Sequence, residues 1–428
     1  MQLERLRVFG HADERTIEQI KNCMAVEEDA RAVLCADNHL GYSQPIGGAV
    51  AYREHISPSG VGYDIGCGNK AVLTDLNASD IDVPSVMDEI VRRISFGIGR
   101  KTKDPVYHPV LDEIRNADFA PQRSLLDLAA SQLGTVGAGN HYVDLFADEL
   151  DRLWIGVHFG SRGFGHKTAS GFLSLAQGGR FEDRGVEGEM MSPPVVFPVR
   201  SAIGQDYIAA MTLAGKYAYA GRDIVCNTVL DILGAREVDS VHNHHNFAWQ
   251  EEHDGETWWV IRKGCTPAFP GQRGFVGATM GEESVILEGT AQGAAALFST
   301  VHGAGRVMSR SEAAGRRRQR WTCNTRDCDW VQAPKTQKPQ ACPRCGNSRL
   351  RKIWVQEQEG KIDFDAVRKQ LRAKGIELRG GAADEAPGAY KRLDEVLAAH
   401  GDTIRVIHRL RPIGVAMAGP DEFDPFKD

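Results

Sequence analysis

Hydrophobic and polar positions along the chain predict helices and strands in irregular succession. Apolar residues at helical spacing predict a long helix over residues 205–233, which Gly234 should end. The same spacing predicts shorter helices over 13–26, 291–300, 364–374 and 391–400. Short apolar runs predict strands over 153–158, 257–261, 284–288 and 403–409. Because the two kinds of element do not alternate regularly, the pattern favours an α+β fold over a doubly wound sheet.

Composition adds limits to this picture. With 42% hydrophobic and 25% charged residues in 428, the chain has the composition of a globular protein and not of a disordered chain, a fibre or a coiled coil. No apolar run approaches the roughly 20 residues of a membrane span, so no membrane partner is expected. The first ten residues lack an apolar segment, so no secretory signal is expected. The net charge of -6 does not by itself indicate a nucleic-acid binder, although a local basic patch can act as one.

A sharp change in composition marks an insert near residue 312. Residues 309–320 are strongly basic, a cluster of four cysteines follows, and ordinary globular sequence returns near Trp354. We therefore expect a single large mixed domain that carries a small zinc-ribbon insert. The expected parts are a first core segment at 1–311, the insert at 312–356, and a C-terminal core segment at 357–428.

The clustered cysteines have the spacing of a structural zinc site. A C-x4-C pair and a C-x2-C pair place four thiolates on two tight turns, as tetrahedral Zn²⁺ requires. Four protein ligands leave no open position, which indicates a structural and not a catalytic ion. The expected ligands are Cys323, Cys328, Cys342 and Cys345. The other five cysteines are scattered, which argues against a disulfide framework and predicts a reducing, cytoplasmic location.

Basic and aromatic residues surround these cysteines. Trp321 and Trp330 are interleaved with ten cations, namely Arg316, Arg317, Arg318, Arg320, Lys335, Lys338, Arg344, Arg349, Arg351 and Lys352. A basic ribbon with aromatic rings is typical of a clamp that holds nucleic-acid phosphates and bases. A solvated charged face would produce the same run of residues, and the sequence leaves both interpretations open.

A second group of ligand-type residues is spread over five glycine-rich or strand-end motifs. They are Asp64 and Cys67 in GVGYDIGCG, Asn140 and His141 in GTVGAGNHY, His158 in VHFGSRGFGHK, His242, His244 and His245 in VHNHHNF, and His302 in STVHGAGR. One thiolate, one carboxylate and three imidazoles can hold two divalent ions, and this donor mixture suits manganese, iron, cobalt or zinc. Any one of these histidines alone would be interpreted as an ordinary hydrogen-bonded residue. The glycine-rich loops also expose N–H groups that bind phosphate.

The motifs, in their order along the chain, resemble those of the RtcB family of RNA-splicing ligases. The matching segments are DNHLGYSQPIGG, GVGYDIGCG, GAGNHY, HFGSRGFGHK, HHNF, RKG, STVHGAGRVMSR, EAPGAYK and RLRPIGV. The resemblance implies an RtcB-like fold and an RNA ligase that joins 3′-phosphate or 2′,3′-cyclic-phosphate ends to 5′-hydroxyl ends, in RNA repair or tRNA splicing. It also implies GTP and two manganese(II) ions as cofactors, a guanylylated histidine, and an archease-type activator as a partner.

The resemblance assigns roles residue by residue. The histidine that becomes guanylylated in the family corresponds to His302, and an aspartate near the phosphates or metal corresponds to Asp37. The manganese ligands correspond to Asp64, Cys67, His141, His158 and His245, with Cys67 in the bridging place. The nucleotide contacts correspond to Asn140, Tyr142, Thr279 and Ser284. Around His302, small residues leave space for a phosphate and a cation adds charge, namely Gly303, Ala304, Gly305 and Arg306.

The sequence departs from the family pattern in the nucleotide pocket. Met417 stands where the family has a lysine that contacts guanine, and Pro267 replaces an arginine after RKG. Asp144 replaces a glutamate, and the stretch between RKG and ATMG is shorter. The metal set is complete. Two alternatives to the ligase therefore stay open: a metal-dependent phosphoesterase or cyclic-phosphate hydrolase, and an RNA-binding protein with a degenerate ligase core.

Overall fold

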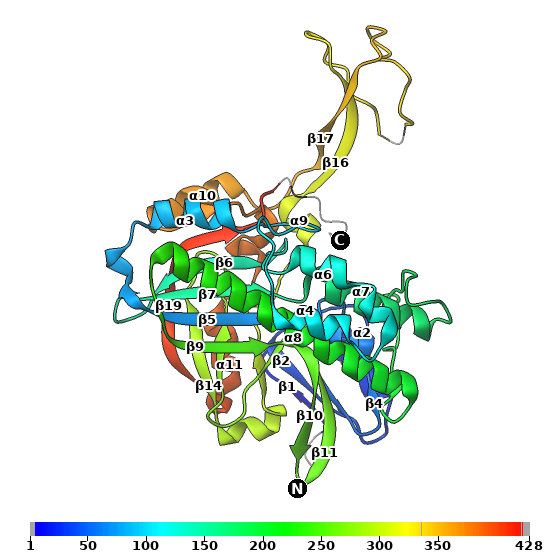
Figure 1. Ribbon diagram of the computed structural model, residues 1–428, viewed down its shortest axis with the longest axis vertical. Coiled ribbons are helices and arrows are strands. Elements are labelled where there is room, and N and C mark those ends of the chain that lie inside the picture. The colour runs from blue at the N-terminus through cyan, green and yellow to red at the C-terminus, as the bar shows by residue number, and fades with distance from the viewer. Residues whose placement is uncertain (1–4, 335, 421, 423–428) are drawn as a thin grey trace.

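Two mixed sheets form the body of the protein in the computed structural model, which describes residues 5–334, 336–420 and 422 (Figure 1). Lys335 therefore lies outside the described residues. The five-stranded sheet has the order β1-β2-β3-β11-β10. Its strands are β1 (Leu6–Val8), β2 (Arg31–His39), β3 (Ile46–Tyr52), β10 (Asn246–His253) and β11 (Glu256–Lys263). Only the β1–β2 pair is parallel among these pairings.

The eight-stranded sheet has the order β13-β14-β19-β6-β7-β5-β9, with β18 paired to β19. Its strands are β5 (Gly68–Asn77), β6 (Tyr142–Ala147), β7 (Arg152–Phe159), β9 (Glu237–His244), β13 (Arg273–Val276), β14 (Ser284–Gly289), β18 (Glu377–Arg379) and β19 (Ile404–Met417). Three small antiparallel ladders complete the strands, β4 (His55–Ile56) with β8 (Phe197–Pro198), β12 (Cys265–Pro267) with β15 (Ser299–Val301), and β16 (Arg316–Cys323) with β17 (Leu350–Gln358). The predicted α+β class is confirmed.

Helices cover the sheets at several places. The α-helices are α1 (Glu14–Met24), α2 (Pro58–Val61), α3 (Val83–Arg93), α4 (Pro109–Arg115), α5 (Ala120–Arg123), α6 (Leu126–Gln132), α7 (Arg162–Ala176), α8 (Ala202–Leu233), α9 (Arg310–Ala314), α10 (Phe364–Ala373) and α11 (Leu393–His400). The 3-10 helices are η1 (Ala78–Asp80), η2 (Ala291–Ala296), η3 (Ala383–Glu385), η4 (Pro387–Ala389) and η5 (Gly401–Thr403). No helix within the described ranges has the length and apolar character needed to cross a membrane.

The long helix α8 organises the core beside the site. Its N-terminus is capped by the Ser201 hydroxyl, which accepts from the Gly204 N–H, and it ends at Gly234, whose φ of 63° is left-handed. The predicted end at Gly234 is confirmed. The helix packs on α7 and on strands β5 and β7 (Figure 1). Tyr207 and Tyr217 are fully buried in this layer. Burial of α8 fixes the ends of β5 and β7, where the ligand-type residues lie.

Two predicted elements differ from the structure. The helix predicted over 291–300 forms only as the 3-10 helix η2 over Ala291–Ala296 and is wrong beyond it, because Leu297 and Phe298 have left-handed φ values of 47° and 44°. The chain then enters β15, because Cys265 and Val301 pair across the β12–β15 ladder. The strand predicted over 403–409 continues to Met417. A register shift near Pro412, which has no N–H to donate, lets β19 pass from β14 to β6.

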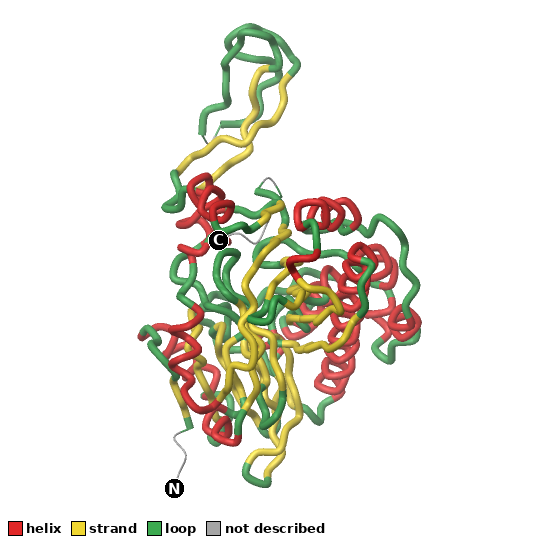
Figure 2. The backbone as a smooth tube through the Cα atoms, turned by 90° about the vertical axis from the view of Figure 1, so that its left-hand side faces the viewer, coloured by secondary structure: helices red, strands yellow, loops and turns green. Residues whose placement is uncertain are grey.

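The hairpin of β16 and β17 leaves the body as an arm (Figures 1 and 2). We use "the arm" for residues 316–358. At its base Arg316 pairs with Gln358, while Ala313 is fully buried and Glu312 accepts the N–H of Lys361. The projecting part therefore begins after α9, which is packed on the body.

Candidate active site

Strand pairing in the eight-stranded sheet gathers the ligand-type residues. Gly68 at the start of β5 lies opposite Phe159 of β7 on one side and His244 of β9 on the other. This register places Cys67, His158 and His245 at one sheet end, although they are far apart in the sequence. Tyr142 of β6 lies opposite His158, so His141 joins the group from the third strand end.

The distances within this group are those of ligands that share ions. The Cys67 Sγ lies 3.3 Å from the His158 Nε2 and 3.7 Å from the His141 Nε2. Two ligands on one ion, with bonds of about 2.0–2.3 Å, have separations of this size. The Asp64 Oδ2 lies 3.2 Å from the His141 Nε2, and the His245 ring lies 5.1 Å from the His158 ring between centroids. All five sequence-predicted ligands therefore converge.

Burial sets the protonation of these ligands. Desolvation lowers the pKa values of His158 and His245 well below their usual range, which leaves both rings neutral and able to coordinate. Burial raises the pKa of Asp64, but hydrogen bonding and charge from His141 outweigh it and lower the pKa to about 2. Burial and the neighbouring Asp64 charge raise the pKa of the Cys67 thiol well above its usual range. A bound divalent cation removes the proton of a coordinating thiol, so this position suits a cation.

One unsatisfied histidine nitrogen also fits a metal. Among the described residues, the Nδ1 atom of His245 is buried without a hydrogen-bond partner. Buried polar atoms are normally paired, so such an atom is free to bind a metal ion. The donor set of sulfur, imidazole and carboxylate therefore fits divalent transition-metal ions, which it was expected to hold.

His242 and His244 belong to a different network. The buried guanidinium of Arg222 on α8 donates to the His242 Nε2 at 2.9 Å and lies 2.9 Å from the His244 Nδ1. It also donates to the Gly66 carbonyl at 2.9 Å. These two histidines are therefore hydrogen-bonded core residues that support the loop of Cys67. Sequence reasoning missed Arg222, and the only signal was one arginine within an apolar helical run.

His302 follows β15 and lies against the carboxylate of Asp37, which is on β2 of the five-stranded sheet. The Asp37 Oδ2 accepts from the His302 Nδ1 at 2.7 Å and from the His302 backbone N–H at 3.0 Å. Burial raises the pKa of Asp37, but the hydrogen bonds that it accepts from the His302 ring and backbone lower it, and the pKa lies below its usual value. Asp37 is thus an ionised acceptor, which keeps the proton on Nδ1 and leaves a lone pair on Nε2. The His302 and His245 ring centroids are 4.9 Å apart.

Lys391 supports this arrangement from outside the predicted site. Its Nζ donates to the carbonyls of Ala36 and Asn38, both at 2.9 Å, on either side of Asp37. The ammonium therefore fixes the strand segment that carries the carboxylate. The sequence had placed Lys391 in a family motif, EAPGAYK, without a role.

A cavity of about 790 Å³ lies over the metal-ligand group and His302. Most of the expected nucleotide contacts line it, namely Asn140, Tyr142, Thr279, Gly303, Ala304, Gly305 and Arg306. Ser284 does not line it: its hydroxyl accepts the Ala278 N–H at 3.0 Å and so holds the loop that carries Thr279. The size lies within the usual range for a small-molecule site, about 300–1,000 Å³.

The guanidinium of Arg306 lines the cavity but is occupied by the protein. It donates to the Tyr390 hydroxyl and to the Asp384 carbonyl, both at 2.8 Å, and lies 3.6 Å from the Glu385 carboxylate. Its charge toward a phosphate is therefore partly compensated. The arginine instead ties the loop after His302 to η3 and η4.

Two of the residues that depart from the family pattern, Asp144 and Met417, line the cavity. Met417 pairs with Tyr142 across β19 and β6, and Tyr142 also lines the cavity. Burial raises the pKa of Asp144 well above its usual value, so this carboxyl is neutral. Pro267 lies in β12, buried, and does not line the cavity. The cavity therefore presents a carboxylic acid and a thioether where the family is expected to present a cation.

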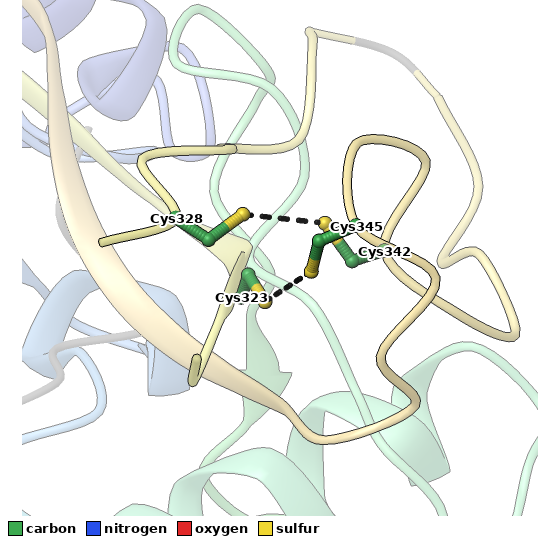
Figure 3. A group of neighbouring side chains, drawn as sticks. All are labelled: Cys323, Cys328, Cys342 and Cys345. Atoms are coloured by element: carbon green, nitrogen blue, oxygen red, sulfur yellow. Dashed lines mark hydrogen bonds between the residues drawn. The ribbon is translucent and has the colours of Figure 1, made fainter. Parts of the chain in front are cut away.

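Four thiols meet in the arm (Figure 3). The Sγ atoms of Cys323 and Cys345 are 3.4 Å apart, and those of Cys328 and Cys342 are 3.7 Å apart. All four sulfur atoms lie within 4.8 Å of one another, which fits a tetrahedron of Zn–S bonds of about 2.3 Å. Hydrogen bonds from the Asn347 N–H and from Cys323 lower the pKa of Cys345 to about 6, which favours the thiolate.

Sequence comparison finds similarity to one protein family over most of the chain. A family model described as "tRNA-splicing ligase RtcB" matches residues 19–122 and 113–329. The chain is 27% identical to the tRNA-splicing ligase RtcB of Thermococcus kodakarensis, over 96% of this chain and 95% of that protein. It is 29% identical to the protein of the same name from Archaeoglobus fulgidus, over 94% and 92%. It is also 29% identical to the RNA-splicing ligase RtcB of Escherichia coli, over 88% and 87%.

Proposed function

Because the chain belongs to the RtcB family and is an RNA ligase, we propose that it joins 3′-phosphate or 2′,3′-cyclic-phosphate ends to 5′-hydroxyl ends through a guanylylated His302. The observation that carries the proposal is the His302–Asp37 pair. It leaves the Nε2 lone pair of His302 available in a cavity of nucleotide size, beside a buried set of metal ligands. The reaction class on RNA is established by the family, whereas the end chemistry and the intermediate are our proposal.

The first steps follow from the geometry of His302. Its Nε2 attacks the α-phosphorus of GTP, the bond to the β-phosphate breaks, and pyrophosphate leaves with the electron pair. Asp37 accepts the Nδ1–H throughout, so it stabilises the positive charge that the ring gains on forming the P–N bond. Gly303 has no side chain and so allows a phosphate to approach beside His302, whereas Gly305 has a φ of 76° and packs against the Asp37 backbone, where a Cβ would clash.

The later steps transfer the guanylyl group to RNA. An oxygen of the RNA 3′-phosphate attacks the guanylyl phosphorus, the P–N bond breaks, and His302 is restored. The 5′-hydroxyl of the second RNA then attacks the 3′-phosphorus, the new phosphodiester forms, and GMP leaves. A 2′,3′-cyclic phosphate must first be opened by water to a 3′-phosphate.

We assign the metal role to two manganese(II) ions held by Asp64, Cys67, His141, His158 and His245. When bound, such ions polarise phosphoryl oxygens and neutralise the charge that develops on them. The neutral imidazoles of His158 and His245, the low pKa of Asp64 and the unpaired Nδ1 of His245 support this assignment. The zinc in the arm would be a separate, structural ion.

Covalent labelling tests the proposal directly. The protein is incubated with α-labelled GTP and manganese(II), and the products are separated on a denaturing gel. A labelled protein band is expected, and the label should move to RNA that carries a 3′-phosphate. A parallel reaction with labelled ATP tests the nucleotide preference. This preference needs its own test because Asp144 and Met417, which depart from the family pattern, line the cavity. A protein that opens cyclic phosphate but takes no label from either nucleotide would be the hydrolase alternative.

Asp37→Asn should slow guanylylation of His302. An amide can donate its N–H to Nδ1 and trap the other tautomer, in which Nε2 carries the proton and cannot attack. We expect the labelling rate to fall roughly 10²- to 10⁴-fold, by analogy with the loss of an orienting carboxylate in a catalytic triad. Single-turnover labelling with GTP measures the rate. Asp223→Asn is the matched control, since Asp223 pairs with Lys70 and His242 and does not contact His302 among the pairs that the described residues form. Labelling by Asp37→Asn at the wild-type rate would contradict the positioning role.

Cys342→Ser should remove one zinc per chain and unfold the tip of the arm. The arm projects from the body (Figure 1), and Cys323 and Cys342 are its buried apolar residues among those described, so its folding energy must come largely from the metal. The melting temperature of the body should change little. Metal analysis and hydrogen exchange over residues 316–358 measure both effects, with Cys226→Ser as a buried-thiol control outside the arm. Unchanged zinc content would show that the four thiols do not form the site.

Two further parts of the proposal concern the cell. We place the protein in the cytoplasm, and the nine free cysteines, four of them in one cluster, support a reducing compartment.

We also extend the proposal to an archease-type activator. Its test is whether such a protein turns a single round of ligation into multiple turnover at unchanged enzyme concentration.

A further inference from the structure

The arm and the body carry opposite charge. Residues 316–358 contain eleven Lys and Arg but three Asp and Glu, a net charge of +8, and the rest of the chain therefore carries -14. A zinc ion with four thiolates would reduce the arm to +6 by the charges of its parts. A strongly cationic arm on an anionic body is an attractive site for a polyanion, whereas the body as a whole repels one.

Strand register sorts the residues of the arm onto two faces. Paired residues of antiparallel strands point to the same side, so Trp321 shares a face with its partner Lys352, and Gln319 shares it with Trp354. The opposite face carries Arg318 and Arg320 with their partners Val355 and Ile353.

The acidic residue of the hairpin strands lies on that opposite face. Glu357 forms ion pairs there with Arg318 and Arg320. The strand residues on the Trp321 face include no Asp or Glu. Lys352 on the Trp321 face therefore has no carboxylate beside it on the two strands.

Lysines gather around the ring of Trp321. The Lys338 Nζ lies 4.2 Å from the ring centroid, and the Lys352 Nζ lies 5.4 Å from it. Both lysines are exposed and Trp321 is half-buried, so the ring holds the two ammonium groups by cation–π contact where they can meet a phosphate. A positively charged surface that follows the phosphate backbone is one of the usual means of holding single-stranded nucleic acid.

The arm begins at the rim of the cavity. Ser309, Arg310 and Glu312, which precede it, line the cavity with His302. A Cβ built on Gly139 would lie 2.6 Å from an Arg310 nitrogen, so this helix start touches the loop of Asn140. The strand β16 has 8 residues and spans about 26 Å at roughly 3.3 Å per residue. The arm can therefore contact an RNA strand well beyond the end that occupies the cavity.

We propose that the Trp321 face of the arm binds the single-stranded RNA substrate outside the cavity, through phosphate contacts from Lys338 and Lys352, whose ammonium groups Trp321 holds in place. The proposal rests on RNA being the substrate, which the family establishes. A protein partner fits less well, since Val331 is the one exposed large hydrophobic residue among the described residues of the arm. The binding is independent of base sequence, because lysine and phosphate carry no sequence information.

The test neutralises the two lysines in the full-length protein. Lys338→Gln/Lys352→Gln is compared with wild type for binding to an RNA of about 30 nucleotides and one of about 5, the shorter lying near the minimum size of a single-strand site. For the long RNA, the plot of the logarithm of the association constant against the logarithm of the salt concentration has a negative slope. The magnitude of this slope should decrease by about 1.4, or about 0.7 for each lost phosphate contact. In ligation, KM for long RNA should rise at unchanged kcat, and short RNA should behave as with wild type.

Two comparisons make the result specific. Arg180→Gln/Arg236→Gln removes two exposed cations of the body, which pair with Asp183 and Asp75, and should leave the slope unchanged. Lys338→Arg/Lys352→Arg keeps both charges and should restore the wild-type slope and KM. Zinc content and the melting temperature verify that each variant is folded.

Three outcomes would overturn the proposal. They are an unchanged slope and KM in the Lys→Gln variant, an equal loss in the body control, and a fall in kcat on both RNA lengths. Binding is measured by fluorescence anisotropy without any ligation. Failure of the wild-type protein to join the proposed ends would therefore count against the proposed function, while the salt slope would still decide the role of the arm.

Discussion

His302→Ala is expected to abolish covalent transfer of GMP to the protein and the joining of unactivated RNA ends. The imidazole Nε2 is the only nucleophile that the proposed first step uses, so no slower route through the same intermediate remains. The variant should keep its fold and metal content, because the side chain contacts Asp37 and is not in the predicted ligand set. Labelling with α-labelled GTP and ligation of a 3′-phosphate RNA measure the two losses.

A pre-activated substrate separates the chemical steps. RNA that already carries a guanylyl group on its 3′-phosphate needs only the attack of the 5′-hydroxyl. His302 holds no guanylyl group in that step. We expect His302→Ala to join this RNA at a rate close to wild type. His166→Ala, on α7 and outside the predicted ligand set, is the matched control and should retain labelling. Wild-type joining of unactivated ends by His302→Ala would show that the nucleophile lies elsewhere.

Cys67→Ser is expected to lose most of the bound manganese. Its labelling rate should decrease by a factor of about 10² or more. A serine hydroxyl of similar size keeps its proton at neutral pH, whereas a thiol gives up its proton to a bound divalent ion. Cys67 contacts both His141 and His158, so its loss affects the centre of the donor set and not its edge. Loss of a residue that only hydrogen-bonds to a metal ligand lowers metal affinity or activity about 10–100-fold, and loss of a ligand itself should lower them more.

The zinc in the arm provides an internal reference for this experiment. Cys67→Ser should lose manganese but retain one zinc per chain, because Cys323, Cys328, Cys342 and Cys345 are a separate cluster. Cys226→Ser, a buried thiol on α8 away from the donor set, should retain both metals and full labelling. Manganese binding by Cys67→Ser at the wild-type stoichiometry and affinity would contradict the bridging place of the thiol.

The arrangement explains how a metal set and a nucleophile share one buried region. The eight-stranded sheet supplies Cys67, His158 and His245 at its end, and the five-stranded sheet supplies Asp37 on β2. His302 follows β15, whose partner β12 continues from β11 of the five-stranded sheet. The five-stranded sheet therefore positions Asp37, which holds His302, and the eight-stranded sheet positions the ligands. The cavity lies over both groups.

The sequence by itself determined the α+β class, the long helix with its end at Gly234, and the positions of the ligand-type residues. These features are local, since helical spacing, a C-terminal glycine and a cysteine spacing depend on neighbouring residues. The sequence also determined which residues could be ligands, because few side chains offer sulfur, imidazole or carboxylate donors.

Only the tertiary structure decided which of these residues meet. Register between β5, β7 and β9 separated His245, which faces the ligands, from His244 and His242, which bind Arg222. The same kind of long-range pairing turned the predicted helix at 291–300 into η2 and β15, because pairing with β12 outweighed local helical preference. Contacts between residues hundreds of positions apart, such as Asp37 and His302, have no local signature, since their energy is gained only when the two sheets pack.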